Sequence, residues 1–151
     1  MGYELIYNRV LIIPIVAWAA AQLLKTILIL VRERRLDFRL FFSSGGMPSS
    51  HSAVVGSLAM AAGMIYGFGS AVFGVAAILA AIVMSDASGV RQSVGQQAEV
   101  LNRIMEELRF KRITYLERDL KEFIGHTQFQ VIIGAFLGIM VAWVWVTVSN
   151  L

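Results

Sequence analysis

Residues 10–31 read VLIIPIVAWAAAQLLKTILILV, and this stretch decides the class of fold. Its strongly polar members are only Gln22 and Lys25, and a helix needs about 20 predominantly apolar residues to cross the hydrocarbon core of a bilayer. Three further stretches of this kind follow, at about residues 51–68, 71–90 and 131–148. None has an amphipathic pattern that would give it a water-facing side. The sequence therefore predicts an all-α bundle with about four transmembrane helices.

The composition agrees with a membrane protein. Of 151 residues, 58% are hydrophobic and 15% are charged, and the mean hydropathy is +0.71. A soluble domain carries about 25% charged residues. The length fits one domain, residues 1–151. With no cysteine in the chain, disulfides, thiolate metal sites and a cysteine nucleophile are excluded.

The basic residues predict an orientation. Arginine and lysine gather in residues 32–39 and 91–121, whereas residues 66–70 carry no charge. The positive-inside rule places both basic loops in the cytoplasm and both termini outside. Four crossings agree with this, because an even number returns the chain to the side on which it started. Excess positive charge suits nucleic acid or anionic lipid, and the long apolar segments favour lipid. We expect an integral protein of a bacterial inner membrane, partnered by the bilayer and not by nucleic acid.

Residues 92–123 have a different pattern. Leu101, Ile104 and Leu108 recur at helical spacing, and acid-before-base pairs such as Glu99 and Arg103 lie four residues apart, which stabilises a helix. This pattern predicts one or two amphipathic helices on the cytoplasmic face. They are either solvated linker helices or surface helices attracted to anionic headgroups.

The last apolar segment contains a GxxxG motif at Gly134 and Gly138. Two glycines at this spacing let helix backbones approach closely. The motif is consistent with packing inside one chain and with a homodimer, and the sequence leaves both open.

The predicted topology collects nearly every candidate polar residue at the cytoplasmic ends of the four segments. They are Lys25, Arg32 and Arg34 at that end of the first; Ser49, Ser50 and His51 at the start of the second; Asp86 and Arg91 at the close of the third; Lys121 and His126 before the fourth. Arginines suit bidentate contacts with phosphate.

Two of these polar elements invite a closer interpretation. Pro48 and the serines predict a capped helix start. This start either has a structural role alone, or its free N–H groups bind a phosphate. Asp86 is an ionisable group in an apolar segment, and such groups are costly and usually functional. It could hold a neighbouring cation or ligate a metal. No tight cluster of ligands accompanies it, so we expect neither metal nor cofactor.

Three runs carry a resemblance to a known family: GGMPSSHSA at residues 45–53, DASGVR at 86–91 and LKEFIGHT at 120–127. They resemble the divergent branch of the type-2 phosphatidic acid phosphatase family, which is related to acid phosphatases and vanadium-dependent haloperoxidases. The likeness covers nearly the whole chain, including AQLLK at 21–25 and QAEVLN at 97–102. The first run is highly specific for this branch.

The resemblance implies roles for these residues. His126 would be the nucleophile that forms a phosphohistidine, and His51 the acid that protonates the leaving group. Lys25 and Arg32 match the first family motif in spacing, although Glu33 replaces its proline, and Arg34 fits that motif equally well. No Ser-Arg pair precedes His126, so Arg91 and Lys121 are the available substitutes for the missing arginine.

Gln130 departs from the family pattern. The position four residues after the histidine holds Asp in the classical family and usually Glu in the divergent branch. An acidic partner stabilises the imidazolium, whereas glutamine accepts a hydrogen bond without bringing charge. Either the protein is slow or inactive, or the residue was substituted, or Asp86 or Glu122 supplies the acid.

We expect a phosphatase that hydrolyses a lipid phosphomonoester, such as phosphatidylglycerophosphate or phosphatidate, at the cytoplasmic face. Phosphoryl transfer depends mainly on positioning and on cations around the equatorial oxygens, and the site residues fit that demand. The alternative is a non-catalytic binder or carrier of lipid phosphates, which uses the same cations without a phosphohistidine. A small oligomeric scaffold or channel is the third reading.

Overall fold

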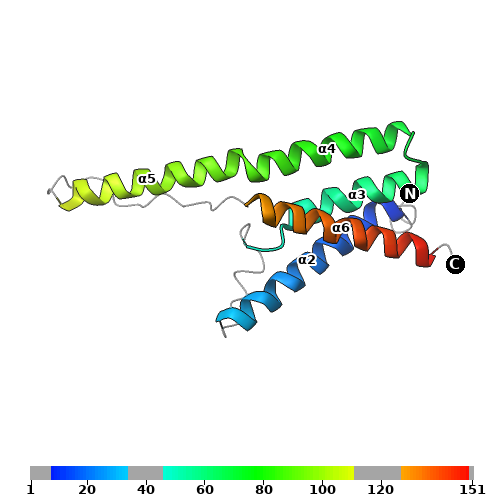
Figure 1. Cartoon of the computed structure of the whole chain (residues 1–151), viewed down its shortest axis with the longest axis horizontal. Helices are drawn as coiled ribbons and strands as arrows, with labels where there is room; N and C mark the ends of the chain where they lie inside the picture. Colours follow the sequence, from blue (N-terminus) through cyan, green and yellow to red (C-terminus); the bar gives the residue numbers. More distant parts are fainter. Residues whose placement is uncertain (1–7, 34–45, 111–126, 150–151) are drawn as a thin grey trace.

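The computed structural model describes residues 8–33, 46–110 and 127–149; within them, residues 32–33, 90–92 and 107–110 are described as helix without their side chains (Figure 1). Five helices account for nearly all of it: α2 (Arg9–Glu33), α3 (Ser50–Tyr66), α4 (Ala71–Ser88), α5 (Val90–Phe110) and α6 (Gln128–Ser149). The described segments contain no strand. The all-α prediction is confirmed.

Helix α3 forms the centre of the bundle and contacts α2, α4 and α6. Its buried residues are small: alanines, glycines and serines, with Val55 the largest of them. Small side chains let neighbouring backbones approach closely, which is how helices associate where lipid provides no hydrophobic drive between them. One buried cluster joins three helices: it consists of Ile13 of α2, Ala61 of α3, and Ala142 and Val146 of α6.

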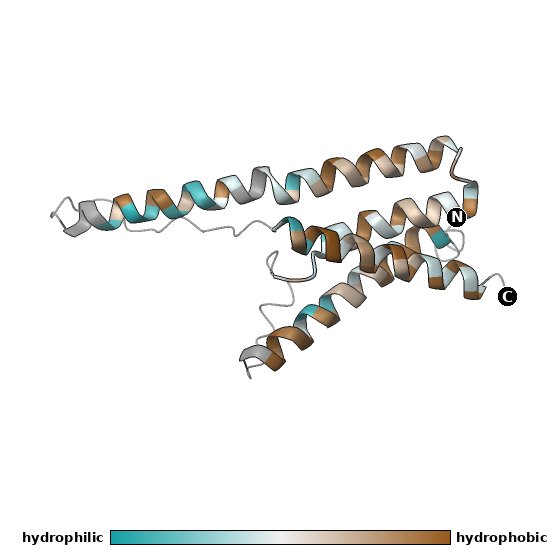
Figure 2. Ribbon diagram, viewed as in Figure 1, coloured by the Kyte–Doolittle hydropathy of each residue, from teal (hydrophilic) through white to brown (hydrophobic). Residues whose placement is uncertain are grey.

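Many of the bulky apolar side chains of the described helices point outward. Val75 of α4 is 70% exposed, and Leu23 of α2 and Phe136 of α6 are exposed as well. Figure 2 shows this apolar character along α2, α4 and α6. Such a surface is far more apolar than that of a soluble monomer. It is the surface expected of a protein whose solvent is lipid, and the membrane class is confirmed.

Three stretches of helix are long and apolar enough to cross a membrane: Arg9–Val31, Ala71–Glu106 and Gln128–Ser149. They match the first, third and fourth predicted segments. The second predicted segment forms α3, which has 17 residues. At 1.5 Å per residue it extends about 25 Å, a little less than the roughly 30 Å hydrocarbon core. Because α3 is packed against α2, α4 and α6, the residues that it buries are small.

A tight turn joins α3 to α4 as an antiparallel pair. Gly67 adopts φ +92°, a left-handed conformation that glycine tolerates, and the Ser70 hydroxyl accepts a hydrogen bond from the N–H of Phe73 at 3.2 Å. Because the pair is antiparallel, α4 returns to the level at which α3 begins. Helix α4 ends, and α3 and α6 begin, at one end of the bundle, which we call the polar end, and α2 passes this end and diverges from the other helices (Figure 1).

Helix α5 continues the course of α4 and projects beyond the bundle (Figure 1). Hydrogen bonds of helical spacing carry across the junction, from Gly89 N–H to the Ser85 carbonyl at 2.9 Å and from Ser93 N–H to the Gly89 carbonyl at 3.0 Å. The predicted amphipathic helix is therefore present over residues 90–110, and it prolongs α4 in place of turning away from it. The rest of the predicted segment, residues 111–123, lies outside the described residues.

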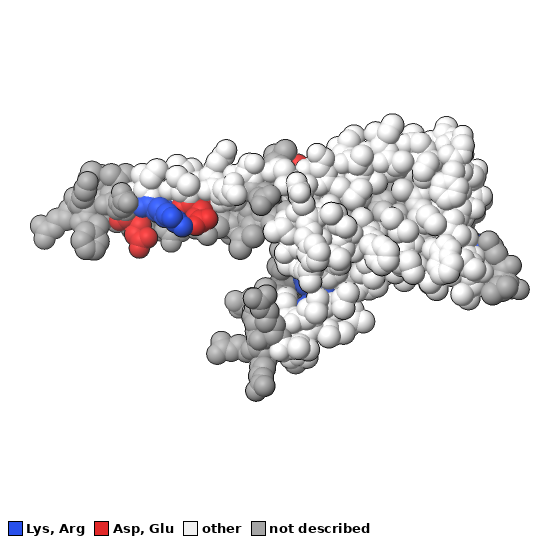
Figure 3. Space-filling view, viewed as in Figure 1, with Lys and Arg blue, Asp and Glu red and all other residues white. Residues whose placement is uncertain are grey.

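Charged side chains on the face shown in Figure 3 lie mostly over α5. They include the i,i+4 ion pair of Glu99 and Arg103. Over its whole length α5 contains three arginines and three glutamates. Because these charges balance, the net charge of α5 alone does not attract it to anionic headgroups, and both predicted alternatives stay predictions.

The two glycines of the GxxxG motif face α3. A Cβ atom placed on Gly134 would lie 3.1 Å from the Ser49 carbonyl carbon, and one placed on Gly138 would lie 2.8 Å from the Ala53 carbonyl carbon. Only glycine permits this approach of α6 to α3. The motif therefore packs inside the chain, and a homodimer, which stays a prediction, would use another face of α6.

Candidate functional site

The starts of α3 and α6 are tied together at the polar end. The backbone N–H of Ser49 donates a hydrogen bond to the carbonyl oxygen of Gln130 at 3.2 Å. His51 follows Ser49 by two residues, and Thr127, the first described residue before α6, directly follows His126. The start of α3, which carries His51, and the start of α6, which follows His126 in the sequence, thus lie side by side, although the two histidines are 75 positions apart in the sequence. His126 itself lies outside the described residues.

The first turn of α3 is held by its own serines. The Ser49 hydroxyl accepts from the Ser52 N–H at 3.4 Å and from the Ser52 hydroxyl at 3.0 Å, as an N-cap does. Ser49 and Ser50 are buried, and His51 is exposed. The predicted capped start is confirmed. The Ser49 hydroxyl thus caps the helix, while the predicted contact of Ser49 and Ser50 with phosphate stays a prediction.

Lys25 is buried beneath the segment that leads into α3. Its side chain is 1% exposed, and its methylene groups lie 3.6–3.8 Å from the point where a Cβ on Gly46 would be. Gly46 adopts φ +92°, which favours glycine there. Gln22, one turn earlier on α2, is also buried. A lysine enclosed within an apolar helix is costly to bury, and such residues are usually functional.

Asp86 and His51 are equally far along the chain from the turn between α3 and α4. Each is 15 residues from the turn that joins α3 to α4, counted from Tyr66 to His51 and from Ala71 to Asp86. In an antiparallel pair, residues equidistant from the turn lie at the same height. The side chain of Asp86 is half-buried. The structure thus brings the carboxyl-bearing turn of α4 to the polar end, as predicted.

Gln130 has a local role that the sequence interpretation missed. Its side-chain Oε1 accepts a hydrogen bond from the Thr127 N–H at 3.1 Å, and its own N–H donates to Thr127 Oγ1 at 3.3 Å. This reciprocal pair is a capping box, and it satisfies N–H groups at the start of α6. The signal was present in the sequence, because Thr127 and Gln130 have the Thr-x-x-Gln spacing directly before an apolar run.

The remaining predicted site residues are not placed. Arg34 and Lys121, like His126, lie outside the described residues, and Arg32 and Arg91 are described only as part of their helices. Within the described segments, no group of three His, Cys, Asp or Glu side chains could hold a metal ion. The described part of the site therefore consists of Lys25, Gly46, Ser49, His51, Asp86 and Gln130, contributed by α2, α3, α4, α6 and the segment before α3.

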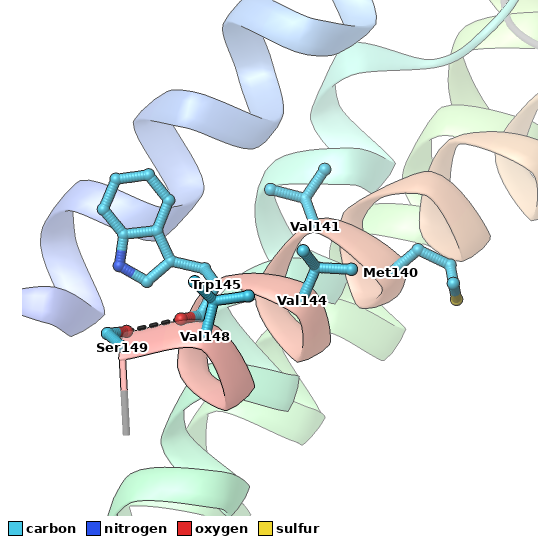
Figure 4. A pocket seen from close by; sticks show the side chains of 6 residues that line it. All are labelled: Met140, Val141, Val144, Trp145, Val148 and Ser149. Carbon is cyan, nitrogen blue, oxygen red and sulfur yellow. Dashed lines mark hydrogen bonds between the residues drawn. The ribbon is translucent and has the colours of Figure 1, made fainter. Parts of the chain in front are cut away.

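One apolar cavity lies away from these residues. It has a volume of about 560 Å³ and lies near the C-terminal end of α6, lined by Met140, Val141, Val144, Trp145, Val148 and Ser149 (Figure 4). The Ser149 hydroxyl donates a hydrogen bond to the Trp145 carbonyl of the same helix, so this polar group already has a partner within α6. Since α6 begins at the polar end, this cavity lies at the opposite end of the bundle and takes no part in the candidate site.

The fold and the site define a membrane-embedded helical bundle with a histidine, a buried lysine and an aspartate at one end. Residues 6–141 match the family described as the Divergent PAP2 family. The chain is also 37% identical over 147 residues to the "Uncharacterized membrane protein YuiD" of Bacillus subtilis (strain 168), which covers 91% of this chain and 93% of that relative. No solved structure matches it. The chain belongs to the Divergent PAP2 family, and is a phosphatase-related membrane protein.

Proposed function

We propose that the protein is a lipid phosphate phosphatase whose site lies at the polar end of the bundle. The hydrogen bond between Ser49 and Gln130 carries the proposal, because it joins the segment of His51 to the segment that directly follows His126. The substrate is a lipid phosphomonoester of the phosphatidate or phosphatidylglycerophosphate type. In this proposal the polar end faces the cytoplasm of a bacterial inner membrane, with both chain termini outside.

In the proposed reaction, a ring nitrogen of His126 attacks phosphorus and the bond from phosphorus to the lipid oxygen breaks. His51, protonated at the start, gives its proton to that oxygen and releases the lipid alcohol. Water then attacks the phosphohistidine, His51 accepts a proton from it, and inorganic phosphate leaves. In this proposal Lys25, Arg32 and Arg34 balance the charge on the equatorial oxygens, and Asp86 holds one cation of the site in place.

Phosphate release from the purified protein in detergent tests this proposal. Wild-type protein should release phosphate from a phosphatidate-type lipid without added divalent metal and should carry base-stable, acid-labile phosphate on histidine after rapid quenching. His126→Ala should lose both properties. Ile78→Ala, on the lipid-facing surface of α4, should keep both. Phosphate release that persists in His126→Ala would show that another group is the nucleophile.

A second function, non-catalytic binding or transport of lipid phosphates, is favoured by Gln130. Its side-chain oxygen is engaged by the Thr127 N–H, and it supplies no carboxylate to an imidazolium at position 126. A binder would retain lipid phosphate through Lys25 and would form no phosphoenzyme. The quench experiment therefore separates the two functions, since phosphohistidine forms only in the catalytic one.

A further inference from the structure

An apolar groove runs between α2 and α3. It has a volume of about 360 Å³ and is lined by residues that include Leu11, Pro14 and Trp18 of α2 and Val54 and Leu58 of α3. Its volume lies within the roughly 300–1,000 Å³ of small-molecule sites. All of its lining side chains are aliphatic or aromatic, so its chemistry suits a hydrocarbon chain.

The α3 wall of this groove leads to His51. Val54 and Leu58 follow His51 by three and seven residues, and residues at these spacings share one face of a helix. With a rise of 1.5 Å per residue, Val54 lies about 4.5 Å and Leu58 about 10 Å along the axis from His51. A molecule held between these two side chains and α2 therefore has one end near the exposed histidine.

The α2 wall leads to Lys25 in the same way. Leu11, Trp18 and Lys25 are spaced seven residues apart, which places them on one face of α2. Both walls of the groove thus end, toward the polar end, in a residue of the candidate site: a histidine on α3 and a lysine on α2.

We propose that the groove between α2 and α3 holds one acyl chain of the lipid phosphomonoester and thereby sets the chain length that the protein accepts. This inference rests on the proposed function for the identity of the headgroup. The continuity of both walls with the site argues for this occupant: a chain lying along Trp18 and Leu58 places its headgroup beside His51 and Lys25.

A groove-filling variant tests the inference. Leu58→Trp should lower kcat/KM for a dioleoyl substrate about tenfold or more, which is the size of effect that a changed fit in an apolar pocket produces. The kcat/KM for a water-soluble dibutyryl substrate should stay within about twofold of the wild-type value. The matched control is Ile78→Trp, which adds the same ring at an exposed position of α4 outside the groove. If both variants affect both substrates alike, the groove does not select the chain.

Photolabelling decides the question independently of turnover and of the variant's folding. The probe is a non-hydrolysable phosphonate analogue of phosphatidate with a diazirine in the acyl chain, applied to wild-type protein in nanodiscs. We expect labels on residues 10–18 and 54–58, severalfold stronger than with phosphatidylcholine carrying the same chain. Equal labelling by both lipids, or labelling elsewhere, overturns the inference. If wild type hydrolyses neither substrate, the phosphatase proposal fails, and the labelling still decides the groove.

Discussion

Gly138→Ala tests whether close contact between α6 and α3 holds the site together. The added Cβ would lie 2.8 Å from the Ala53 carbonyl carbon and 2.9 Å from the Ala53 Cα, whereas ordinary contact begins at 3.4 Å. The obstacle is backbone, which cannot rotate aside as a side chain can. Helix α6 must therefore move away from α3 by several tenths of an ångström or more. Overpacking of this kind costs about 1–3 kcal/mol.

The displacement should also reach the site. Ala53 lies one helical turn after Ser49, whose N–H donates to the Gln130 carbonyl at 3.2 Å, so the same shift stretches the link between the starts of α3 and α6. A misplacement of about 1 Å can cost about 100-fold in rate. We expect Gly138→Ala to lower the apparent melting temperature in detergent by about 2–12 °C and to lower phosphate release by one to two orders of magnitude, on the order expected for such a displacement.

Gly74→Ala is the matched control. Gly74 lies inside α4, and a Cβ there would meet nothing within 4 Å, so the change should be neutral or stabilise the helix by about 0.5–1 kcal/mol. Thermal unfolding followed by intrinsic fluorescence, together with phosphate release, measures both variants. The reasoning is refuted if Gly138→Ala is as stable and as active as Gly74→Ala. Loss of a dimer with unchanged monomer stability would instead assign the motif to self-association.

The other predictions concern caps and charge. Gln130→Ala should lower the free energy of unfolding by about 1 kcal/mol, because the Thr127 N–H loses its acceptor; a thermal melt checks this. Gln130→Glu should keep the capping box and raise phosphate release, because it restores an acid after His126. A Glu variant no faster than wild type in a rate assay would show that position 130 does not support the histidine. Ser49→Ala should lower the free energy of unfolding by about 0.5–2 kcal/mol, which a lower melting temperature would show. An unchanged melting temperature would show that the Ser49 cap does not stabilise the protein. Lys25→Met should abolish phosphate release, because it removes a buried cation of the candidate site; full activity would exclude Lys25 from the site.

The sequence predicted the topology well because membrane insertion depends on length and hydropathy, which are local properties. Runs such as residues 10–31 and 131–148 need no knowledge of partners to be recognised. It also predicted that Lys25, His51 and Asp86 share one end, since helix direction follows from the number of crossings. The order of packing was harder to predict. That α3 lies in the centre depends on its small residues matching the glycines of α6, which is a property of two segments together.

The direction of α5 and the role of Gln130 were missed for a different reason. Gly89 suggests a break, but the hydrogen bonds on either side of it keep helical spacing, and local sequence does not show which alternative wins. Gln130 fits the catalytic pattern by its distance from His126 and a capping box by its distance from Thr127, and its side chain makes the second contact. Where one residue fits two patterns, only geometry shows which contact it makes.

The central claim is that both histidines contact one phosphoryl group. Because the chain has only two histidines, their imidazole nitrogens can be followed by solid-state NMR of ¹⁵N-histidine-labelled protein in nanodiscs with bound inorganic phosphate. We predict ³¹P–¹⁵N dipolar coupling from the same phosphate to both imidazoles, with both signals responding at one phosphate concentration. Coupling to one histidine alone, or to neither, would contradict the claim.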